Sequence, residues 1–237
     1  MPRAVLFDLD DTLFDHSGCA RCALEAVHAG QDAWRRTPFD SFALAHARIL
    51  EMLHRDVLAG RRTIDEAREE RFRQLLIETG GAADPALARA AAARYRAEYV
   101  TVRRAIDGAA ALLEHVHSRL SVGIVTNNLR DEQIEKLRAC DLERHIDVLV
   151  VSEEAGVAKP DPAIFHLAIE RLGCAPSEAI MVGDSWDADV IGARAAGITP
   201  VWFNPGGAPP PDPSVPVLRK LSPADAALSA ILDAHRR

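Results

Sequence analysis

The chain has 237 residues, of which 48% are hydrophobic and 27% charged, and 28 Lys and Arg against 35 Asp and Glu give a net charge of −7. This balance is typical of a globular protein with one large domain, or with a core and a smaller lobe. The acidic charge argues against a nucleic-acid polymer as partner, because proteins that bind one normally present a basic face. No apolar stretch approaches the roughly 20 residues that span a bilayer, and the early acids are not typical of an export signal, so we expect a cytoplasmic protein without membrane association.

A short buried strand is predicted over residues 3–8, and it leads directly into the segment Asp8-Leu9-Asp10-Asp11-Thr12. If the chain stays extended there, the side chains of Asp8 and Asp10 project to the same side. Two neighbouring carboxylates at the end of a buried strand are costly unless they share a cation or a proton. The segment is therefore a candidate for catalysis or metal binding. A helix-loop-helix calcium loop is excluded, because it needs Gly and Glu where this chain has Leu13 and Cys19.

Residues 15–103 contain no convincing strand and are predicted to form a helical unit, with helices near 17–29, 41–59, 64–78 and 85–100. Thr63 and Glu66 have the spacing of a capping box at the start of the third helix. Cys19 and Cys22 form a C-x-x-C pair, but no second pair follows at zinc-finger spacing, so thiols on a helix face are favoured over a metal or redox role.

Several polar residues of this helical unit are candidate substrate contacts: His16, Arg21, His46, His54 and Arg55. Such side chains on helices usually form solvated faces, and we assign none of them to substrate binding.

From residue 104 onward, apolar strands alternate with helices. The strands are expected near 121–126, 147–151, 179–183 and 199–203, and the helices near 108–118, 131–139, 162–172 and 187–196. Asp161, Pro162 and Gly173 mark the ends of one of these helices; residues 204–215 are predicted to form a loop, and Ser222-Pro223 to start a final helix. The alternation predicts an α/β fold with a Rossmann-like parallel-sheet core, formed by 1–14 and 104–237, and an inserted α-helical domain, formed by 15–103.

Four polar clusters follow the predicted strands, at the edge where ligands of open parallel sheets bind. They are Asp8 with Asp10, Thr126 with Asn127 and Asn128, Ser152 through Lys159, and Gly183 through Asp189. Each has an ordinary structural explanation when taken alone, such as an acid that starts a helix or a lysine in a solvated loop. Their convergence at one edge favours a functional site. Neither a P-loop nor a G-x-G-x-x-G motif follows the first strand, so nucleotide binding of those kinds is not supported.

The ordered set resembles the motifs of the haloacid dehalogenase-like (HAD) hydrolase superfamily, in its phosphatase branch. D-x-D-x-T matches Asp8 to Thr12, the Ser or Thr that ends a strand matches Thr126, the Lys before Pro matches Lys159, and G-D-x-x-x-x-D matches Gly183 to Asp189. The run 151–160 is similar to nucleotidase and N-acylneuraminate-9-phosphatase members. The resemblance covers nearly the whole chain, and it implies that residues 15–103 are the family's helical cap.

The resemblance implies a Mg²⁺-dependent phosphatase that hydrolyses a small phosphomonoester, such as a nucleoside monophosphate or a sugar phosphate. Asp8 would form an aspartyl phosphate, and Asp10 would protonate the leaving oxygen and then activate water. Mg²⁺ would be held by Asp8, the backbone carbonyl of Asp10, and Asp184. Asp189 would support water at the metal or orient Lys159. The residues implied to bind the phosphoryl group are Asp11, Thr126, Asn127 and Lys159.

Other activities remain open. A phosphosugar mutase shares the metal chemistry, whereas a 2-haloacid dehalogenase needs neither the metal nor the acid at Asp10. A non-catalytic binding module would be expected to lack at least one motif residue, and none is missing. Gly183-Asp184-Ser185 also resembles the first block of GDS-type serine esterases, with Ser185 as nucleophile, but the D-x-x-H of that family is one residue too short at Asp233-Ala234-His235. Both a monomer and a homodimer agree with the sequence.

Overall fold

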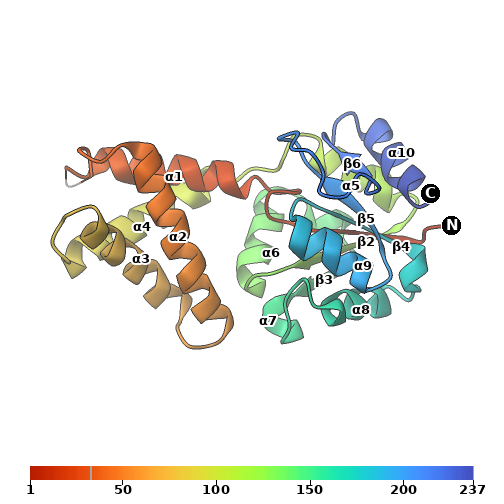
Figure 1. Ribbon diagram of the computed structural model, residues 1–237, viewed down its shortest axis with the longest axis horizontal. Coiled ribbons are helices and arrows are strands. Elements are labelled where there is room, and N and C mark those ends of the chain that lie inside the picture. The colour runs from red at the N-terminus through yellow and green to blue at the C-terminus, as the bar shows by residue number, and fades with distance from the viewer. Residues whose placement is uncertain (33, 237) are drawn as a thin grey trace. The chain divides into compact units, whose positions relative to one another are not determined.

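The computed structural model describes residues 1–32 and 34–236. The chain divides into two compact units, one formed by Met1–Asp15 with Arg104–Arg237 and the other by His16–Arg103 (Figure 1). We call them the sheet unit and the helical unit. The second is inserted into the first between the first strand and the rest of the sheet, so the chain leaves the sheet unit once and returns to it once.

The sheet unit contains a six-stranded parallel sheet with the order β3-β2-β1-β4-β5-β6. The strands are β1 Ala4–Phe7, β2 Ser121–Thr126, β3 Val148–Val151, β4 Ala179–Gly183, β5 Thr199–Phe203 and β6 Val217–Leu218. The predicted α/β fold with a Rossmann-like sheet is thereby confirmed. The short strand β6 was not predicted from the sequence, because two residues are too few to show a periodic pattern.

β1 lies in the middle of the sheet, where strand pairs on both sides satisfy its backbone. All four of its residues are buried, as expected for a parallel strand covered on both faces. Phe7 pairs with Ile124 of β2 and with Val182 of β4. The residues that follow Phe7, Ile124 and Val182 therefore emerge together at one edge of the sheet, because parallel strands all end at the same edge.

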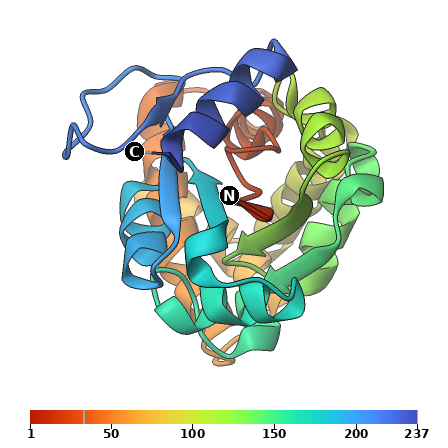
Figure 2. The same cartoon turned by 90° about the vertical axis from the view of Figure 1, so that its right-hand side faces the viewer.

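Helices cover both faces of the sheet, which Figure 2 views nearly along its strands. α5 Ala109–His117 packs on β2, and α10 Ala224–Ala234 packs on β5 and on α5, which places both on one face. α8 Pro162–Arg171 and α9 Gly192–Ala195 pack on each other and on the opposite face. The remaining elements of this unit are α6 Arg130–Ala139, α7 Ser152–Ala155, the 3₁₀ turns Glu143–His145 and Pro176–Glu178, and the π-helical turn Trp186–Ile191.

The predicted start of α8 is confirmed. The Asp161 carboxylate accepts a hydrogen bond of 2.9 Å from the backbone N–H of Ala163, Pro162 occupies the first turn, and Gly173 follows the helix with φ = 63°. This local agreement matters for the site, because the loop that leads into α8 carries Lys159.

The helical unit consists of α1 His16–Gly30, α2 Phe39–Leu58, α3 Ile64–Glu78 and α4 Pro85–Thr101. α3 packs against both α2 and α4, and α4 also packs against α1. Trp34, Phe42 and Phe72 are fully buried in its interior. The capping box of α3 is present as predicted, with Thr63 Oγ1 accepting from the N–H of Glu66 and the Glu66 carboxylate accepting from the N–H of Thr63.

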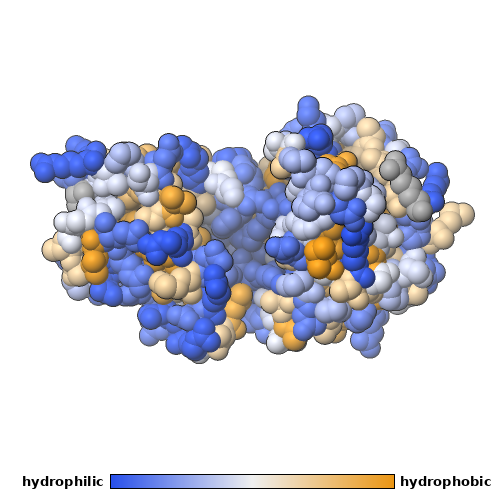
Figure 3. Space-filling view, viewed as in Figure 1, coloured by the Kyte–Doolittle hydropathy of each residue, from blue (hydrophilic) through white to orange (hydrophobic). Residues whose placement is uncertain are grey.

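The face of each unit that Figure 3 shows is mostly polar. On the face shown in Figure 3, hydrophobic residues form small separate groups among hydrophilic ones, and the large exposed hydrophobic side chains include Leu44, Met52 and Ile191. Among the described residues, no helix is both long and apolar enough to cross a membrane.

The cysteine pair of α1 faces two environments. The thiol of Cys19 is buried and donates to the carbonyl oxygen of Val102 at 3.2 Å, whereas Cys22 is exposed. The two thiols therefore differ in environment, one buried and bonded to the backbone and the other in contact with solvent, which agrees with the interpretation that favoured ordinary helix-face thiols over a joint metal or redox role.

Candidate functional site

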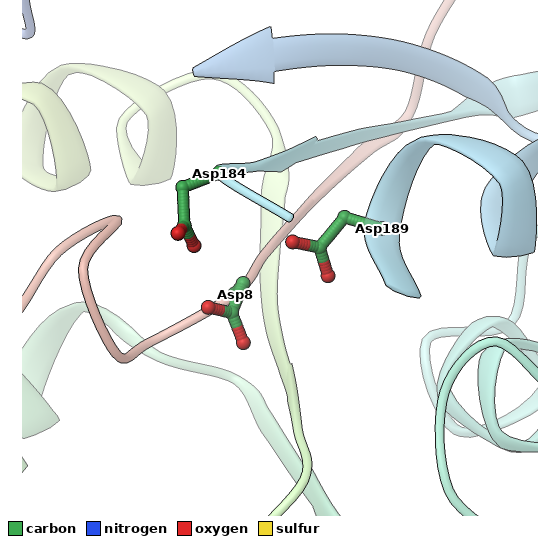
Figure 4. A group of neighbouring side chains, drawn as sticks. All are labelled: Asp8, Asp184 and Asp189. Atoms are coloured by element: carbon green, nitrogen blue, oxygen red, sulfur yellow. The ribbon is translucent and has the colours of Figure 1, made fainter. Parts of the chain in front are cut away.

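Three carboxylates meet at the edge of the sheet where β1 and β4 end (Figure 4). Asp8 follows β1, Asp184 follows β4, and Asp189 lies in the turn Trp186–Ile191. One oxygen of each carboxylate lies within 4.8 Å of those of the other two. The sequence placed all three residues at strand ends, and the structure brings them together.

Gly183 makes this convergence possible, because it leaves room for the Asp189 side chain to turn back toward the sheet. A Cβ atom at position 183 would lie 2.2 Å from Asp189 Oδ2, which is far inside van der Waals contact. The same Asp189 oxygen accepts a hydrogen bond of 2.9 Å from the N–H of Ser185. The sequence predicted a continuous helix over 187–196; the structure has the π-helical turn followed by the short α9 instead, and this wider turn carries Asp189.

Lys159 supplies the positive charge of the site. Its Nζ atom lies 2.6 Å from Asp8 Oδ1 and 2.6 Å from Asp189 Oδ1, and its side chain is only 3% exposed. Burial alone would lower the pKa of Lys159, but the carboxylates of Asp189 and Asp8 outweigh burial and raise it. Lys159 therefore carries a proton at every physiological pH and ties the two carboxylates together.

Asn127 holds the backbone of Lys159 in place. Its side-chain amide donates to the Lys159 carbonyl at 2.9 Å and accepts from the Lys159 N–H at 2.7 Å. This pair of bonds joins the loop after β2 to the loop before α8. One N–H of the amide is used in this way, so the second amide N–H and the backbone N–H are what Asn127 can offer to a phosphoryl group.

Two further residues fix Asp184. Thr12 Oγ1 donates to Asp184 Oδ1 at 3.1 Å and accepts from the Asp184 N–H at 3.0 Å, which links the first predicted motif to the fourth. The indole N–H of Trp202 donates to the carbonyl oxygen of Asp184 at 2.8 Å. No sequence signal identified Trp202, since an aromatic residue at the end of a buried strand is expected to be core.

The acidic cluster carries more negative charge than Lys159 alone can balance. Burial raises the pKa of Asp8 well above its ordinary value, and the charges of Asp189 and Asp184 raise it further, against the opposing effect of Lys159. Burial, followed by the charges of Asp189 and Asp11, raises the pKa of Asp184 from 3.8 to about 6. A hard divalent cation with oxygen ligands would relieve this repulsion. The donor set therefore fits Mg²⁺.

A testable consequence concerns Asp184 in the absence of metal. Its folded-state pKa lies above the unfolded value, so its contribution to stability is present below pH 4 and is lost as the pH rises through about 6. In excess chelator at pH 8, Asp184→Asn should therefore raise the free energy of unfolding by about 1–3 kcal/mol. The gain should disappear near pH 4.

Thermal unfolding of both proteins, with and without Mg²⁺, measures this effect. We expect Mg²⁺ to stabilise the wild type at pH 8 and to have little effect on Asp184→Asn, because a metal ligand is lost. A variant less stable than the wild type in chelator at pH 8 would contradict the electrostatic explanation.

The carboxylate of Asp10 is held by α6. Lys136 Nζ lies 2.7 Å from each of its two oxygens, and Gln133 Nε2 donates to Oδ2 at 3.1 Å. Asn128 Nδ2 adds a longer bond of 3.3 Å. Lys136 is almost fully buried, with a side chain 2% exposed, whereas the Asp10 side chain keeps 23% exposure. The contacts with α6 thus orient the Asp10 carboxylate from one side, while part of the side chain stays exposed to solvent.

Gln133 also binds Thr126, the residue that ends β2. Its Nε2 atom donates to Thr126 Oγ1 at 2.6 Å, and Thr126 is buried. Because this bond uses an acceptor position of the hydroxyl, the Thr126 proton stays available for an anionic oxygen. Sequence analysis assigned no role to Gln133 or Lys136. Their spacing of three residues, which places them on one helix face directly after the second motif, was the available signal.

Asp11 adopts a left-handed backbone conformation, with φ = 61°. The N–H of Asp11 bonds to the carbonyl oxygen of Phe14 at 2.8 Å, and the N–H groups of Leu13 and Phe14 both bond to that of Leu9. The first motif is therefore a tight turn immediately after β1, and it sets the position of Asp10 relative to Asp8.

The structure does not support the esterase interpretation. Ser185 Oγ accepts a hydrogen bond from the N–H of Ala188 and so caps the following turn. His235, the base that an esterase would need, has its Nδ1 atom 3.3 Å from Thr199 Oγ1. Thr199 begins β5, at the opposite end of that strand from the acidic cluster.

Comparison with known proteins places the chain among enzymes of one kind. Residues 2–197 match the family model of the haloacid dehalogenase-like hydrolases. A phosphoserine phosphatase of Thermus thermophilus is 33% identical, over 92% of this chain and 94% of its own length. The human N-acylneuraminate-9-phosphatase is 29% identical, over 88% of this chain and 85% of its own length. The YfnB protein of Bacillus subtilis, solved with bound magnesium, has a TM-score of 0.72 at 30% identity, over 93% of this chain and 95% of that one.

Proposed function

The chain belongs to the haloacid dehalogenase-like hydrolase family, and from this premise we propose that it is a Mg²⁺-dependent phosphatase that hydrolyses a small phosphomonoester through phosphorylation of Asp8. The family assignment confirms the resemblance seen in the sequence. Relatives named as phosphatases support hydrolysis of phosphoric monoester bonds. The substrate class follows the same expectation as the sequence, a nucleoside monophosphate or a sugar phosphate.

The observation that carries this proposal is the contact between Lys159 and both Asp8 and Asp189, at 2.6 Å each. A buried lysine between two carboxylates holds Asp8 in one orientation and leaves its second oxygen for chemistry. It also puts a fixed positive charge where an anionic phosphoryl group would have to approach. An aspartate that needs only to bind water or cap a helix requires neither.

In the proposed first half-reaction, a carboxylate oxygen of Asp8 attacks phosphorus, and the bond between phosphorus and the ester oxygen breaks. The ester oxygen takes a proton from Asp10 and leaves as an alcohol. The product on the enzyme is an aspartyl phosphate at Asp8, which divides one difficult displacement into two easier ones.

In the second half-reaction, water attacks the phosphorus of the aspartyl phosphate and gives its proton to Asp10, which releases inorganic phosphate and restores Asp8. Lys136 and Gln133 hold the Asp10 carboxylate, which accepts this proton, in place. The proton that Asp10 takes from water replaces the one it gave to the leaving oxygen, so Asp10 returns to its starting form for the next cycle.

Charge on the phosphoryl oxygens would be bound by Lys159 and by the hydroxyl of Thr126, whose proton is available because Gln133 donates to its oxygen. Fixed donors of this kind are worth most where water is excluded, and both residues are buried. Asp8, Asp184 and the backbone carbonyl of Asp10 would hold Mg²⁺, which when bound supplies positive charge to the reacting phosphoryl group.

We further propose that the sheet unit is the catalytic core and the helical unit its cap. Every residue to which we assign a chemical role lies in the sheet unit. The boundary falls after Asp15, whose N–H bonds to the Arg104 carbonyl at 3.1 Å and whose carboxylate pairs with the Arg104 side chain.

Phosphate release from p-nitrophenyl phosphate, with Mg²⁺ and with excess chelator, tests the proposed function. We expect turnover with Mg²⁺ and its loss, by more than about 10²-fold, in chelator, with recovery when Mg²⁺ is restored. p-Nitrophenyl acetate serves as the control for esterase activity. Cleavage of the acetate alone would overturn the proposal, and so would phosphate release that chelator leaves unchanged.

A further inference from the structure

The interior of the helical unit holds a cationic side chain that no carboxylate of the described residues balances. Arg71 of α3 is only 6% exposed. Among residues 1–32 and 34–236, no Asp or Glu lies within ion-pair distance of its guanidinium, and its Nε atom has no hydrogen-bond partner. Unpaired buried guanidinium groups are costly, because the charge loses its hydration without gaining a counterion.

The groups around Arg71 are aromatic and uncharged. The guanidinium carbon lies 4.8 Å from the centre of the Tyr95 ring and 5.4 Å from that of Phe72. The His46 ring contacts the same two rings, at centroid distances of 5.2 and 5.7 Å. We call these four residues, from α2, α3 and α4, the Arg71 cluster. Cation–π contacts offset part of the desolvation of Arg71, but they satisfy none of its N–H donors.

No member of the cluster supplies a negative charge. Burial raises the pKa of the Tyr95 phenol, against the opposing effect of Arg71, so the phenol stays neutral. Burial, followed by the charges of Arg71 and His16, lowers the pKa of His46 well below its ordinary value. The nearby Arg68 adds a like charge and is paired with Asp65 at 2.9 Å. The cluster therefore carries one net positive charge in an apolar setting.

His46 offers a second unused polar atom. Its Nε2 atom is buried and has no hydrogen-bond partner within the described part of the chain, and the residue as a whole is 3% exposed. A native protein leaves few buried polar atoms unsatisfied, and here two such atoms belong to residues that stack on the same rings. Both can act as N–H donors, and Arg71 can present two parallel N–H groups to a planar anion.

We propose that the Arg71 cluster is a binding site for a small anionic group, a carboxylate or a phosphate. Such a group would pair with the guanidinium, accept from His46, and cancel the buried charge. The anion is a separate small molecule that binds within the helical unit, so this inference does not rest on the proposed function.

Direct binding is measured with malonate, a dicarboxylate without a phosphoryl group. The titration is done in excess chelator, where the acidic cluster around Asp8 repels anions. We expect malonate to bind the wild type and to raise its Tm, and Arg71→Met to weaken this binding by about ten- to a hundredfold. Arg73→Met is the matched control, because Arg73 lies on the same helix but is partly exposed and paired with Glu70; it should bind malonate as the wild type does.

The same titration with inorganic phosphate in place of malonate shows which anion the site prefers. Whichever anion binds should bind about ten- to a hundredfold more weakly to Arg71→Met, and Arg73→Met should bind it as the wild type does.

If Arg71 only stabilised the fold, Arg71→Met would lower the Tm. We expect instead that Arg71→Met unfolds at a Tm no lower than that of the wild type in the absence of anions, because Met keeps the apolar stem without the buried charge. Arg71→Lys keeps the charge but loses the paired donors, so it should weaken malonate binding less than Arg71→Met does. This second variant also tests the site if Arg71→Met does not fold. Equal binding of malonate and of phosphate by the wild type and the Arg71 variants would overturn the site. Absence of turnover of any phosphomonoester would overturn the proposed function, but it would leave the malonate result standing.

Discussion

Asp8→Asn is expected to slow phosphate release from p-nitrophenyl phosphate on the order of 10³-fold or more, with Mg²⁺ present. An amide is a far poorer nucleophile than a carboxylate, so the proposed first step loses its attacking atom. The wild type, quenched during turnover, should carry acid-stable but base-labile phosphate on the protein, as an acyl phosphate does, and the variant should carry none. Steady-state rates and phosphate labelling of the quenched protein measure the two effects.

The loss should not come from unfolding. Asp8 is 7% exposed, and burial raises its pKa, so an uncharged side chain of the same size removes a desolvated charge. Lys159 keeps its contact with Asp189. We therefore expect the Tm of the variant in chelator to equal or exceed that of the wild type. Asp187→Asn changes an exposed aspartate in the turn Trp186–Ile191, which also carries Asp189. It is the matched control and should retain full activity. An Asp8→Asn protein that keeps more than about a tenth of the wild-type rate would overturn the nucleophile assignment.

Asp10→Asn is expected to separate the two half-reactions. p-Nitrophenolate leaves without a proton, so the variant should release a burst of it stoichiometric with enzyme and then turn over about 10²- to 10⁴-fold more slowly than the wild type, since water activation has lost its base. An alkyl phosphate such as ethyl phosphate needs a proton on its leaving oxygen. With that substrate the variant should be slow from the first turnover, without a burst.

Lys136→Met should reproduce this pattern in weaker form, because it removes the contacts that orient Asp10 but not the carboxylate itself. We expect kcat to fall by about tenfold with ethyl phosphate and by less in the burst with p-nitrophenyl phosphate. Lys220→Met, at an exposed position, is the control and should match the wild type. Equal losses on both substrates would indicate that Lys136 only stabilises the fold. A missing burst in Asp10→Asn would show that Asp10 acts before the ester bond breaks.

Much of the sheet was predictable from the sequence. The predicted strands 121–126, 179–183 and 199–203 coincide with β2, β4 and β5, because a strand buried on both faces is a nearly continuous apolar run. The edge at which Asp8, Thr126 and Asp184 emerge follows from that pattern, since all parallel strands end on one side. The residue types then indicated a functional site, because carboxylates directly after buried strands are costly unless they share a cation or a proton.

The side chains that hold those residues in place were not predictable in the same way. Gln133, Lys136 and Arg71 sit on helices rich in other polar residues, and a buried polar side chain looks the same in the sequence as a solvated one. Only the tertiary contacts tell them apart. His46 was assigned to a solvated face, as His on a helix usually is, but it is buried. The π-helical turn that carries Asp189 depends on the absence of a Cβ atom at Gly183, and that requirement arises between segments rather than within one.

The hydrogen bonds that join distant segments at the site also determine when the site can form during synthesis. Asp8 and Lys159 are 151 residues apart in the chain, and Thr12 and Asp184 are 172 apart. During synthesis Asp8 is made long before Lys159 and Asp184, so its site stays incomplete until they follow. The helical unit, by contrast, is one uninterrupted stretch of chain and can fold while the later strands are still being made. A nascent chain therefore carries Asp8 without its cation and its neighbouring carboxylates until β4 pairs with β1.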